Sequence, residues 1–125
     1  MEKEVLIKAI IDAAYQVHMS LPPGYVENVY QNAMLVELRS RGIDVVAETP
    51  LQVYYKDVVV GSYKADMIVE GDVLVELKAV NALTSANEVQ LVNYLTTTHI
   101  DDGLLINFGT EKIEVKRKYR KYMDL

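Results

Sequence analysis

The sequence predicts one α/β (α+β) domain in which helices pack on a β-sheet. Half of the 125 residues are hydrophobic and a quarter are charged, a balance typical of a folded globular protein. Three segments repeat apolar residues at the spacing of an amphipathic helix, and runs rich in Val, Ile and Leu lie between and after them. The length suits a single domain spanning residues 1–125.

Two helices are predicted first. Residues 2–19 form an amphipathic helix, because their apolar residues recur every three or four positions, and the Pro-Pro-Gly of residues 22–24 ends it. A second helix is predicted over residues 24–41. With Gly24 as its N-cap, Glu27 occupies the third helical position, where a glutamate can bond an unpaired backbone amide. Taken alone, this capping role is the favoured interpretation of Glu27.

A meander of strands follows the helices. Residues 43–48 are predicted to form a first short strand, which Pro50 separates from a second strand over residues 51–55. A tight turn leads into a longer strand over residues 58–69. Gly61 marks a bulge in that strand or a close approach of another backbone.

The chain is organised around the hairpin of residues 63–80. Both of its arms are rich in Val, Ile and Leu, and its turn contains Gly and Asp. Three charged residues nevertheless lie inside these apolar arms: Asp66 on the first, and Glu76 and Lys78 on the second. Charges rarely enter a central strand unless they are paired or bind a metal, because burying an ion costs several kcal/mol as an order of magnitude.

The register of this hairpin decides whether the charges meet. A three-residue loop at residues 70–72 places Asp66 opposite Glu76, with Lys78 on the same face. A two-residue turn would instead pair Asp66 with Leu77 and separate the carboxylates. Two adjacent carboxylates repel, so the first register predicts a divalent metal between them. A surface cluster of charges on a half-solvated sheet is an equally weighted alternative.

A third helix is predicted over residues 84–97. Residues 85–88 have the pattern of a capping box at its start. Gln90 and Tyr94 are four residues apart and therefore share one face of this helix. On spacing alone, a polar helix flank is the favoured interpretation of these two residues.

Two strands and a basic tail complete the chain. Residues 103–108 are continuously apolar, as in a strand buried on both faces, and residues 112–116 alternate like an edge strand. The net charge of −5 argues against broad nonspecific nucleic-acid binding. The tail, residues 116–125, is basic, and the part after Arg117 is expected to be helical or disordered. It is either merely solvated or contacts phosphate or an acidic partner. Its cations are Lys116, Arg117, Lys118, Arg120 and Lys121.

Composition excludes several other kinds of site. There is no Cys and there are only two His, so neither a disulfide framework nor a Cys-based zinc site is expected. For His18, near a helix end, a structural role is favoured over a catalytic one. No apolar run reaches the roughly 18–20 residues of a membrane span, and the charged residues 2–4 are unlike an export signal. A cytoplasmic location is therefore expected.

Four segments, in order along the chain, resemble the GxxExxY proteins of the PD-(D/E)XK nuclease superfamily. They are VHMSLPPGYVENVY, DMIVEGDVLVELKAV, EVQLVNYL and GLLINFG. Gly24, Glu27 and Tyr30 match the three named positions of the signature, while Pro22 replaces a more usual Gly. The resemblance covers nearly the whole chain. It implies a PD-(D/E)XK nuclease-like fold, with a central mixed β-sheet flanked by helices and an αβββαβ core.

The resemblance also implies roles for single residues. Asp66 matches the metal-binding aspartate of the superfamily, Glu76 the acidic residue of the (D/E)XK motif, and Lys78 its lysine. Ala65 stands where the superfamily name has a proline. Glu27 corresponds to the acidic residue that the first core helix contributes in many members.

A metal site follows from these matches. Asp66, Glu76 and the backbone carbonyl of Leu77 are the implied ligands of Mg²⁺ or Mn²⁺, both hard ions that prefer oxygen. Glu27 is expected to complete the set directly or through a water. Lys78 is expected to orient the attacking water or to stabilise the charge of the transition state.

The implied activity is metal-dependent hydrolysis of phosphodiester bonds in DNA or RNA, with DNA favoured. Gln90 and Tyr94 match a QxxxY pattern of RecB-like nucleases and, together with Tyr30, are expected to position the substrate. The alternative is a non-catalytic module that uses a nuclease-like fold to bind nucleic acid or protein. A homodimer that spans a duplex is a further expectation.

Overall fold

The structure, a computed structural model of the whole chain, describes residues 1–121. It contains three helices and five strands. In chain order they are α1 (Lys3–Ser20), α2 (Glu27–Ser40), β1 (Val45–Tyr55), β2 (Val58–Val69), β3 (Val73–Lys78), α3 (Ser85–Thr98), β4 (Asp102–Asn107) and β5 (Glu114–Tyr119). None of the helices in residues 1–121 is both long and apolar enough to cross a membrane.

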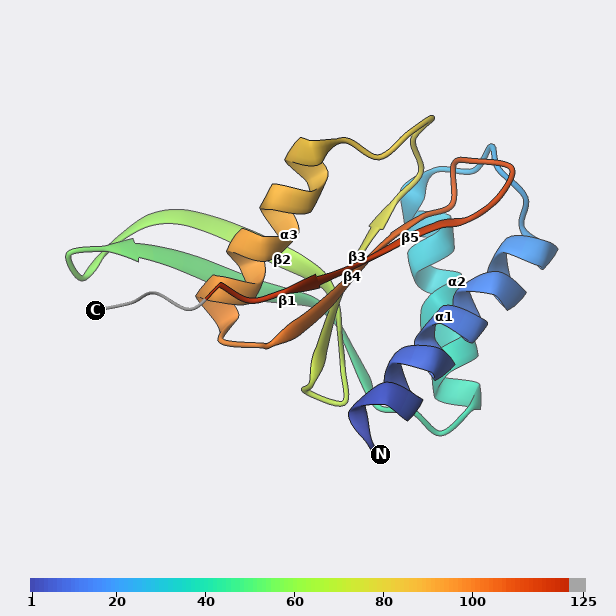
Figure 1. Cartoon of the computed structure of the whole chain (residues 1–125), viewed down its shortest axis with the longest axis horizontal. Coiled ribbons are helices and arrows are strands. Elements are labelled where there is room, and N and C mark those ends of the chain that lie inside the picture. The colour runs from blue at the N-terminus through green and yellow to red at the C-terminus, as the bar shows by residue number, and fades with distance from the viewer. Residues whose placement is uncertain (122–125) are drawn as a thin grey trace.

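The strands form one mixed sheet in the order β1-β2-β3-β4-β5. β3 and β4 are parallel and are joined through α3, whereas every other neighbouring pair is antiparallel. Parallel strands need such a crossover, because a tight turn can join only antiparallel ones. α1 and α2 lie on one side of the sheet and α3 on the other (Figure 1). The predicted mixed sheet flanked by helices is confirmed.

The sheet has a hydrophobic core on each face. Val75 and Leu77 of β3 belong to the larger core, under α1 and α2. Leu74 belongs to the smaller core, where it lies with Leu91 and Leu95 of α3. Because side chains alternate along a strand, Glu76 and Lys78 share the α3 side with Leu74.

The hairpin between β2 and β3 has the register that places its charges together. Met67 pairs with Val75 and Val69 pairs with Val73, so the loop is residues 70–72. The backbone at Gly71 has a φ of 65°, which glycine adopts without a steric penalty. The alternative two-residue turn is excluded.

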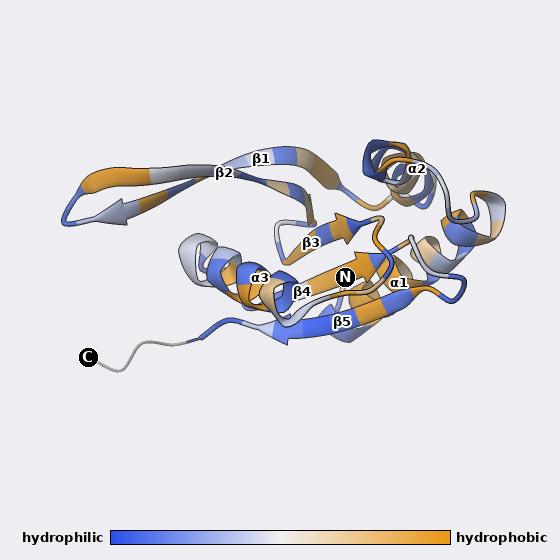
Figure 2. Ribbon diagram, turned by 90° about the horizontal axis from the view of Figure 1, so that it is seen from above, coloured by the Kyte–Doolittle hydropathy of each residue, from blue (hydrophilic) through white to orange (hydrophobic). Residues whose placement is uncertain are grey.

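β1 is one strand rather than the predicted two. It continues through Pro50, which pairs with Lys64 of β2. β1 lies at the edge of the sheet, where a proline, which has no amide hydrogen to donate, is tolerated. The predicted bulge is confirmed: the register shifts between Val53 and Tyr54, where β2 carries Gly61. The β1–β2 hairpin extends well beyond the remainder of the sheet (Figure 2).

The predicted helix starts are wrong by one to three residues. α2 begins at Glu27, with Val26 as a N-cap that makes no side-chain bond. Glu27 is therefore the first helical residue, and the capping interpretation based on Gly24 fails. α3 is capped by Thr84, whose hydroxyl accepts the amide hydrogen bond of Asn87 at 3.2 Å. The capping box thus begins one residue before the predicted Ser85.

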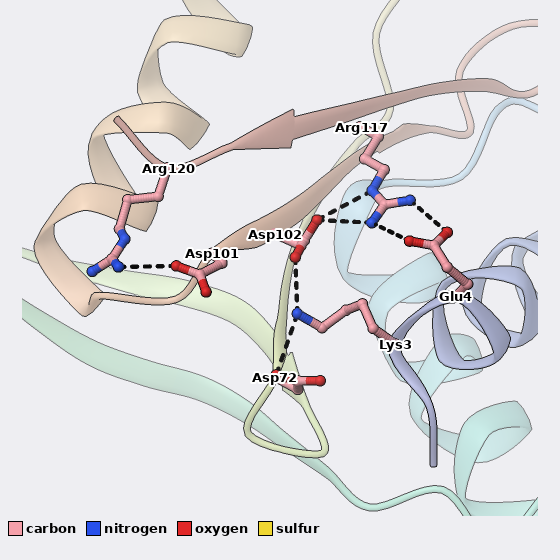
Figure 3. Close-up of polar contacts among 7 residues, drawn as sticks. All are labelled: Lys3, Glu4, Asp72, Asp101, Asp102, Arg117 and Arg120. Carbon is pink, nitrogen blue, oxygen red and sulfur yellow. Dashed lines mark hydrogen bonds and ion pairs between the residues drawn. The ribbon is translucent and has the colours of Figure 1, made fainter. Parts of the chain in front are cut away.

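The first part of the basic tail belongs to the sheet, and the strand continues past Arg117, where helix or disorder was expected. β5 extends to Tyr119 and pairs with the whole of β4. Two of its cations have acidic partners elsewhere in the fold: Arg117 bonds Asp102 and Glu4, and Lys118 lies 2.6 Å from Glu88. Arg120, just after the strand, pairs with Asp101 (Figure 3). The remainder of the predicted tail, residues 122–125, lies outside the described residues.

Candidate active site

Asp66 and Glu76 lie at a fork where β2 and β3 diverge. Backbone pairing of the two strands ends at Met67 and Val75. Beyond that point the strands are joined by hydrogen bonds between backbone amides and side-chain carboxylates. The amide of Asp66 donates to Oε1 of Glu76 at 3.2 Å, and the amide of Leu77 donates to Oδ2 of Asp66 at 2.7 Å. The two carboxylates therefore bridge the strands side by side.

Glu76 is the most strongly perturbed of these groups. Its side chain belongs to the buried set, with only 5% of the residue exposed. Burial, the negative charge of Asp66 and a hydrogen bond with Asp66 raise the pKa of Glu76 to about 9, although Lys78 acts in the opposite direction. A pKa of about 9 means that Glu76 holds a proton at neutral pH in the metal-free protein, because two ionised carboxylates in one buried site would repel each other strongly. A divalent cation is the kind of ligand that relieves this repulsion.

Lys78 ends β3 on the same side of the sheet as Glu76 and is half-buried. Its carbonyl accepts the amide hydrogen bond of Phe108 at 2.8 Å. Asn107, which is fully buried, holds the next segment by exchanging two 3.0 Å hydrogen bonds with the backbone of Val80. The backbone on either side of the lysine is therefore held in place.

Glu27 lies near the pair without joining it in a preformed metal site. Its pKa is raised by burial and by the charge of Asp66, and is lowered less strongly by Lys78. The carboxylate therefore lies within the electrostatic reach of both residues. Among residues 1–121, no three Asp, Glu, His or Cys side chains lie close enough together to hold a metal. A direct role for Glu27 as a third ligand is thus absent from this geometry.

The sequence patterns did not indicate Gln31 as a site residue, although its side chain contacts the site directly. It lies one turn after Glu27 on α2, is nearly buried, and its Nε2 donates to the backbone carbonyl of Asp66 at 3.4 Å. Its spacing of four residues from Glu27 is the signal that could have identified it. Gln31 connects α2 to the strand that carries Asp66.

α3 brings Tyr94 and Gln90 to the other side of the site. Burial first, and then the charges of Glu76, Tyr63 and Asp66, raise the pKa of Tyr94. The ring of Tyr94 lies 5.6 Å from that of Tyr63 on β2. Gln90 and Tyr94 both line a groove of about 720 Å³ between α3 and the β1–β2 hairpin. The helical face predicted from the QxxxY spacing therefore lines this groove, and Tyr94 also lies within the electrostatic reach of the carboxylate pair.

Tyr30 has a different position from the one expected. It is fully buried, its ring stacks on Phe108 at 4.8 Å, and its hydroxyl donates to the carbonyl of Pro22 at 2.8 Å. A side chain without exposed surface cannot contact a substrate, so the expectation that Tyr30 positions one directly is corrected. Tyr30 instead anchors the loop that leads into Glu27.

His18 has the structural role that was favoured for it. Its Nε2 lies 2.9 Å from the backbone carbonyl of Thr110. Since a carbonyl oxygen can only accept, this nitrogen carries the proton. The histidine thus joins the end of α1 to the turn between β4 and β5.

Comparison with known proteins agrees with this fold. The chain matches the PD-(D/E)XK nuclease superfamily over residues 4–118. No curated protein matches it. Among solved structures it is similar to one described as "Crystal structure of SSO0001", with a TM-score of 0.58 and 15% sequence identity. That alignment covers 77% of this chain and 50% of the other, so this chain spans about half the length of its structural neighbour. The family match covers most of the described residues, and the chain therefore belongs to the PD-(D/E)XK nuclease superfamily.

Proposed function

We propose that this protein is a metal-dependent nuclease that hydrolyses phosphodiester bonds of DNA or RNA, with DNA favoured. Membership of the superfamily suggests a nuclease-like function, and nucleases of this superfamily generally depend on a divalent metal. The observation that carries the proposal is the Asp66–Glu76 pair at the fork, with Lys78 on the same side of the sheet. The roles of the individual residues are part of the proposal.

The donor set suits a hard divalent ion. Asp66, Glu76 and the carbonyl of Leu77 would hold Mg²⁺ or Mn²⁺ through oxygen atoms, which both ions prefer. Each carboxylate uses one oxygen to accept a backbone amide, so its second oxygen can serve a cation. The raised pKa of Glu76 marks the charge that such an ion would offset. When bound, the metal would polarise a phosphoryl oxygen and lower the pKa of a water.

The protein residues would then orient the reaction. Hydrolysis forms a bond between phosphorus and the oxygen of water, and breaks the bond to one sugar oxygen. Lys78 would donate to a phosphoryl oxygen and stabilise the charge that develops there. Glu27 would hold a water at the edge of the site, since it lies near Asp66 without completing a three-carboxylate cluster. Gln90 and Tyr94 would position the strand from α3.

The test is a panel of single-stranded, duplex, flap and junction substrates with Mg²⁺, Mn²⁺ or EDTA. Cleavage by the wild type should require the metal and should be abolished in Lys78→Ala. Glu111→Gln is the control, because Glu111 is exposed on the turn before β5. Absence of cleavage on every substrate, together with no metal binding in calorimetry, would refute the proposal.

A non-catalytic module remains the second candidate, and one observation favours it. Asp66 and Glu76 each satisfy a backbone amide of the facing strand, so both carboxylates also have a structural use without metal. Binding through free cations of the basic tail is less well supported than the sequence suggested, because Arg117 and Lys118 are paired with acids. Binding of nucleic acid without turnover in the panel would select this candidate.

Three sequence predictions stay predictions. They are membership of the narrower GxxExxY family, a cytoplasmic location, and assembly as a homodimer. Light scattering of the purified protein would test the dimer directly.

A further inference from the structure

A neutral groove adjoins the candidate active site. It lies between α3 and the β1–β2 hairpin, which extends beyond the other strands (Figure 2). None of the residues that line it within the described part of the chain carries a charge. The lining side chains that matter most are Val53 and Tyr63 of the hairpin and Val89, Gln90, Asn93 and Tyr94 of α3.

This lining is unsuited to a phosphate backbone and suited to a nucleobase. Proteins hold phosphates with cations and backbone amides, and the groove wall presents no cation. It presents instead the exposed ring of Tyr63, the largely buried ring of Tyr94 behind it, and the side-chain amides of Gln90 and Asn93. Flat apolar surfaces with nearby donors and acceptors are what an unpaired base requires, because it stacks on its faces and bonds along its edge.

The hairpin side of the groove is built around Tyr63. This residue is 48% exposed, although its ring lies only 5.6 Å from that of Tyr94. Gly61 makes room for the ring, since a Cβ atom at that position would meet Cε2 of Tyr63 at 3.1 Å. The exposed surface of this ring is therefore available to a ligand.

The groove and the carboxylate pair share Tyr94. This residue lines the groove and also lies within the electrostatic reach of Glu76 and Asp66. A strand whose phosphate lies at the carboxylates therefore has a base close to the groove. In a duplex that base is stacked and paired, and it would have to be extruded at a cost of a few kcal/mol as an order of magnitude.

We propose that this groove binds one unpaired base of the nucleic-acid strand, so that the protein acts on single-stranded segments. The inference rests on the proposed function for the position of the phosphate. It goes beyond that function because it states which form of nucleic acid the site accepts and which residues select it.

The test measures binding without metal, so that it is independent of cleavage. Fluorescence anisotropy in EDTA compares a labelled single-stranded oligonucleotide with the same sequence as a duplex. The single strand should bind at least about tenfold more tightly. Tyr63→Ala should weaken that binding about 10- to 100-fold, the range expected for one lost base–aromatic stack.

A matched control is available on the same hairpin. Tyr55 is 64% exposed and does not line the groove, so Tyr55→Ala should leave the affinity unchanged. An abasic position scanned through the oligonucleotide should weaken wild-type binding at one site and have little effect on Tyr63→Ala. Equal affinity for duplex and single strand overturns the inference, as does equal loss in the two tyrosine variants.

Cleavage with Mn²⁺, measured separately, distinguishes the two proposals. If the protein cleaves duplexes and Tyr63→Ala does not change the rate, the proposed nuclease function is supported and the proposed base-binding role of the groove is overturned. If single strands bind, Tyr63→Ala weakens this binding, and no metal gives cleavage, the base-binding role of the groove is supported and the proposed nuclease function is overturned.

Discussion

Asp66 and Glu76 each accept a hydrogen bond from the backbone of the strand that carries the other. The amide of Asp66 donates to Glu76, and the amide of Leu77 donates to Asp66. This exchange holds two carboxylates together at the point where β2 and β3 part. In the metal-free protein, burial and the charge of Asp66 both raise the pKa of Glu76, so ionising this carboxyl is unfavourable.

The first prediction concerns the pH dependence of folding without metal. A carboxyl whose pKa is raised in the folded state contributes stability below its unfolded pKa, and this stability is lost as the pH rises through the folded pKa. In EDTA, the wild type should therefore lose stability between about pH 5 and pH 9. In Glu76→Gln the decrease in the free energy of unfolding over this pH range should be smaller by roughly 1–3 kcal/mol. The reason is that glutamine still accepts the hydrogen bond from the Asp66 amide but cannot ionise. Urea unfolding at pH 5, 7 and 9 measures the difference.

Glu27 also has a raised pKa, so some pH dependence should persist in Glu76→Gln. The relevant quantity is the difference between the variant and the wild type. Parallel stability profiles for the two proteins would contradict the assignment of this charge to Glu76.

The second prediction concerns metal binding. Mn²⁺ should raise the melting temperature of the wild type, because a ligand that binds only the folded state stabilises it. Asp66→Asn should lose this shift, although the asparagine oxygen can still accept the Leu77 amide. Asp57→Asn, at the tip of the β1–β2 hairpin, is the control and should respond like the wild type. An equal Mn²⁺ shift in Asp66→Asn would show that the ion binds elsewhere.

The third prediction concerns the ion pairs that join the chain ends to the sheet (Figure 3). Asp102 accepts from Lys3 and Arg117 at 2.8 Å each, and its side chain is only 10% exposed. Burial alone would raise the pKa of Asp102, but the bonds from Lys3 and Arg117 outweigh it and lower the pKa. A lowered pKa gives stability that is present above the unfolded value, near 4, and is lost as the pH falls.

Asp102→Asn should therefore cost roughly 1–3 kcal/mol at pH 7 and much less at pH 3. Urea unfolding at the two pH values gives both numbers. Asp44→Asn, at an exposed position, controls for a general effect of removing one negative charge. A cost that is the same at pH 3 and pH 7 would argue against an electrostatic role for Asp102.

The fourth prediction separates loop anchoring from substrate contact at Tyr30. Tyr30→Phe keeps the stacking on Phe108 and loses the hydroxyl bonds to Pro22 and Tyr25. It should cost roughly 1 kcal/mol of stability and retain most of the cleavage rate. Thermal melting and a single-turnover assay measure the two effects. Loss of cleavage at unchanged stability would instead indicate that the hydroxyl takes part in the reaction.

The hairpin at the centre of the site is predictable from the sequence because its determinants are local. A three-residue loop and the two-residue alternation of side chains are enough to place Asp66 beside Glu76. The superfamily resemblance is likewise local, since its segments are short and appear in order. Both the fold class and the superfamily are confirmed on this basis.

The features that the sequence does not reveal depend on distant partners. Arg117 belongs to a strand because β5 pairs with β4, and its acids, Glu4 and Asp102, also lie on distant elements. Tyr30 matches a family signature, yet only its packing against Phe108 shows that it is buried. The spacing of Gln31 places it on the same helix face as Glu27, but its contact with Asp66 lies across the interface between α2 and β2 and is shown only by the structure.

The central claim is that the Asp66–Glu76 pair, with a divalent metal, cleaves nucleic acid. The most direct measurement is the single-turnover cleavage rate of labelled single-stranded DNA as Mn²⁺ is titrated, for the wild type beside Glu76→Gln. We predict a rate that rises with Mn²⁺ and vanishes in EDTA for the wild type, and a loss of at least about 100-fold in Glu76→Gln. Equal cleavage by the two folded proteins, or no cleavage by a wild type that binds Mn²⁺, would contradict the claim.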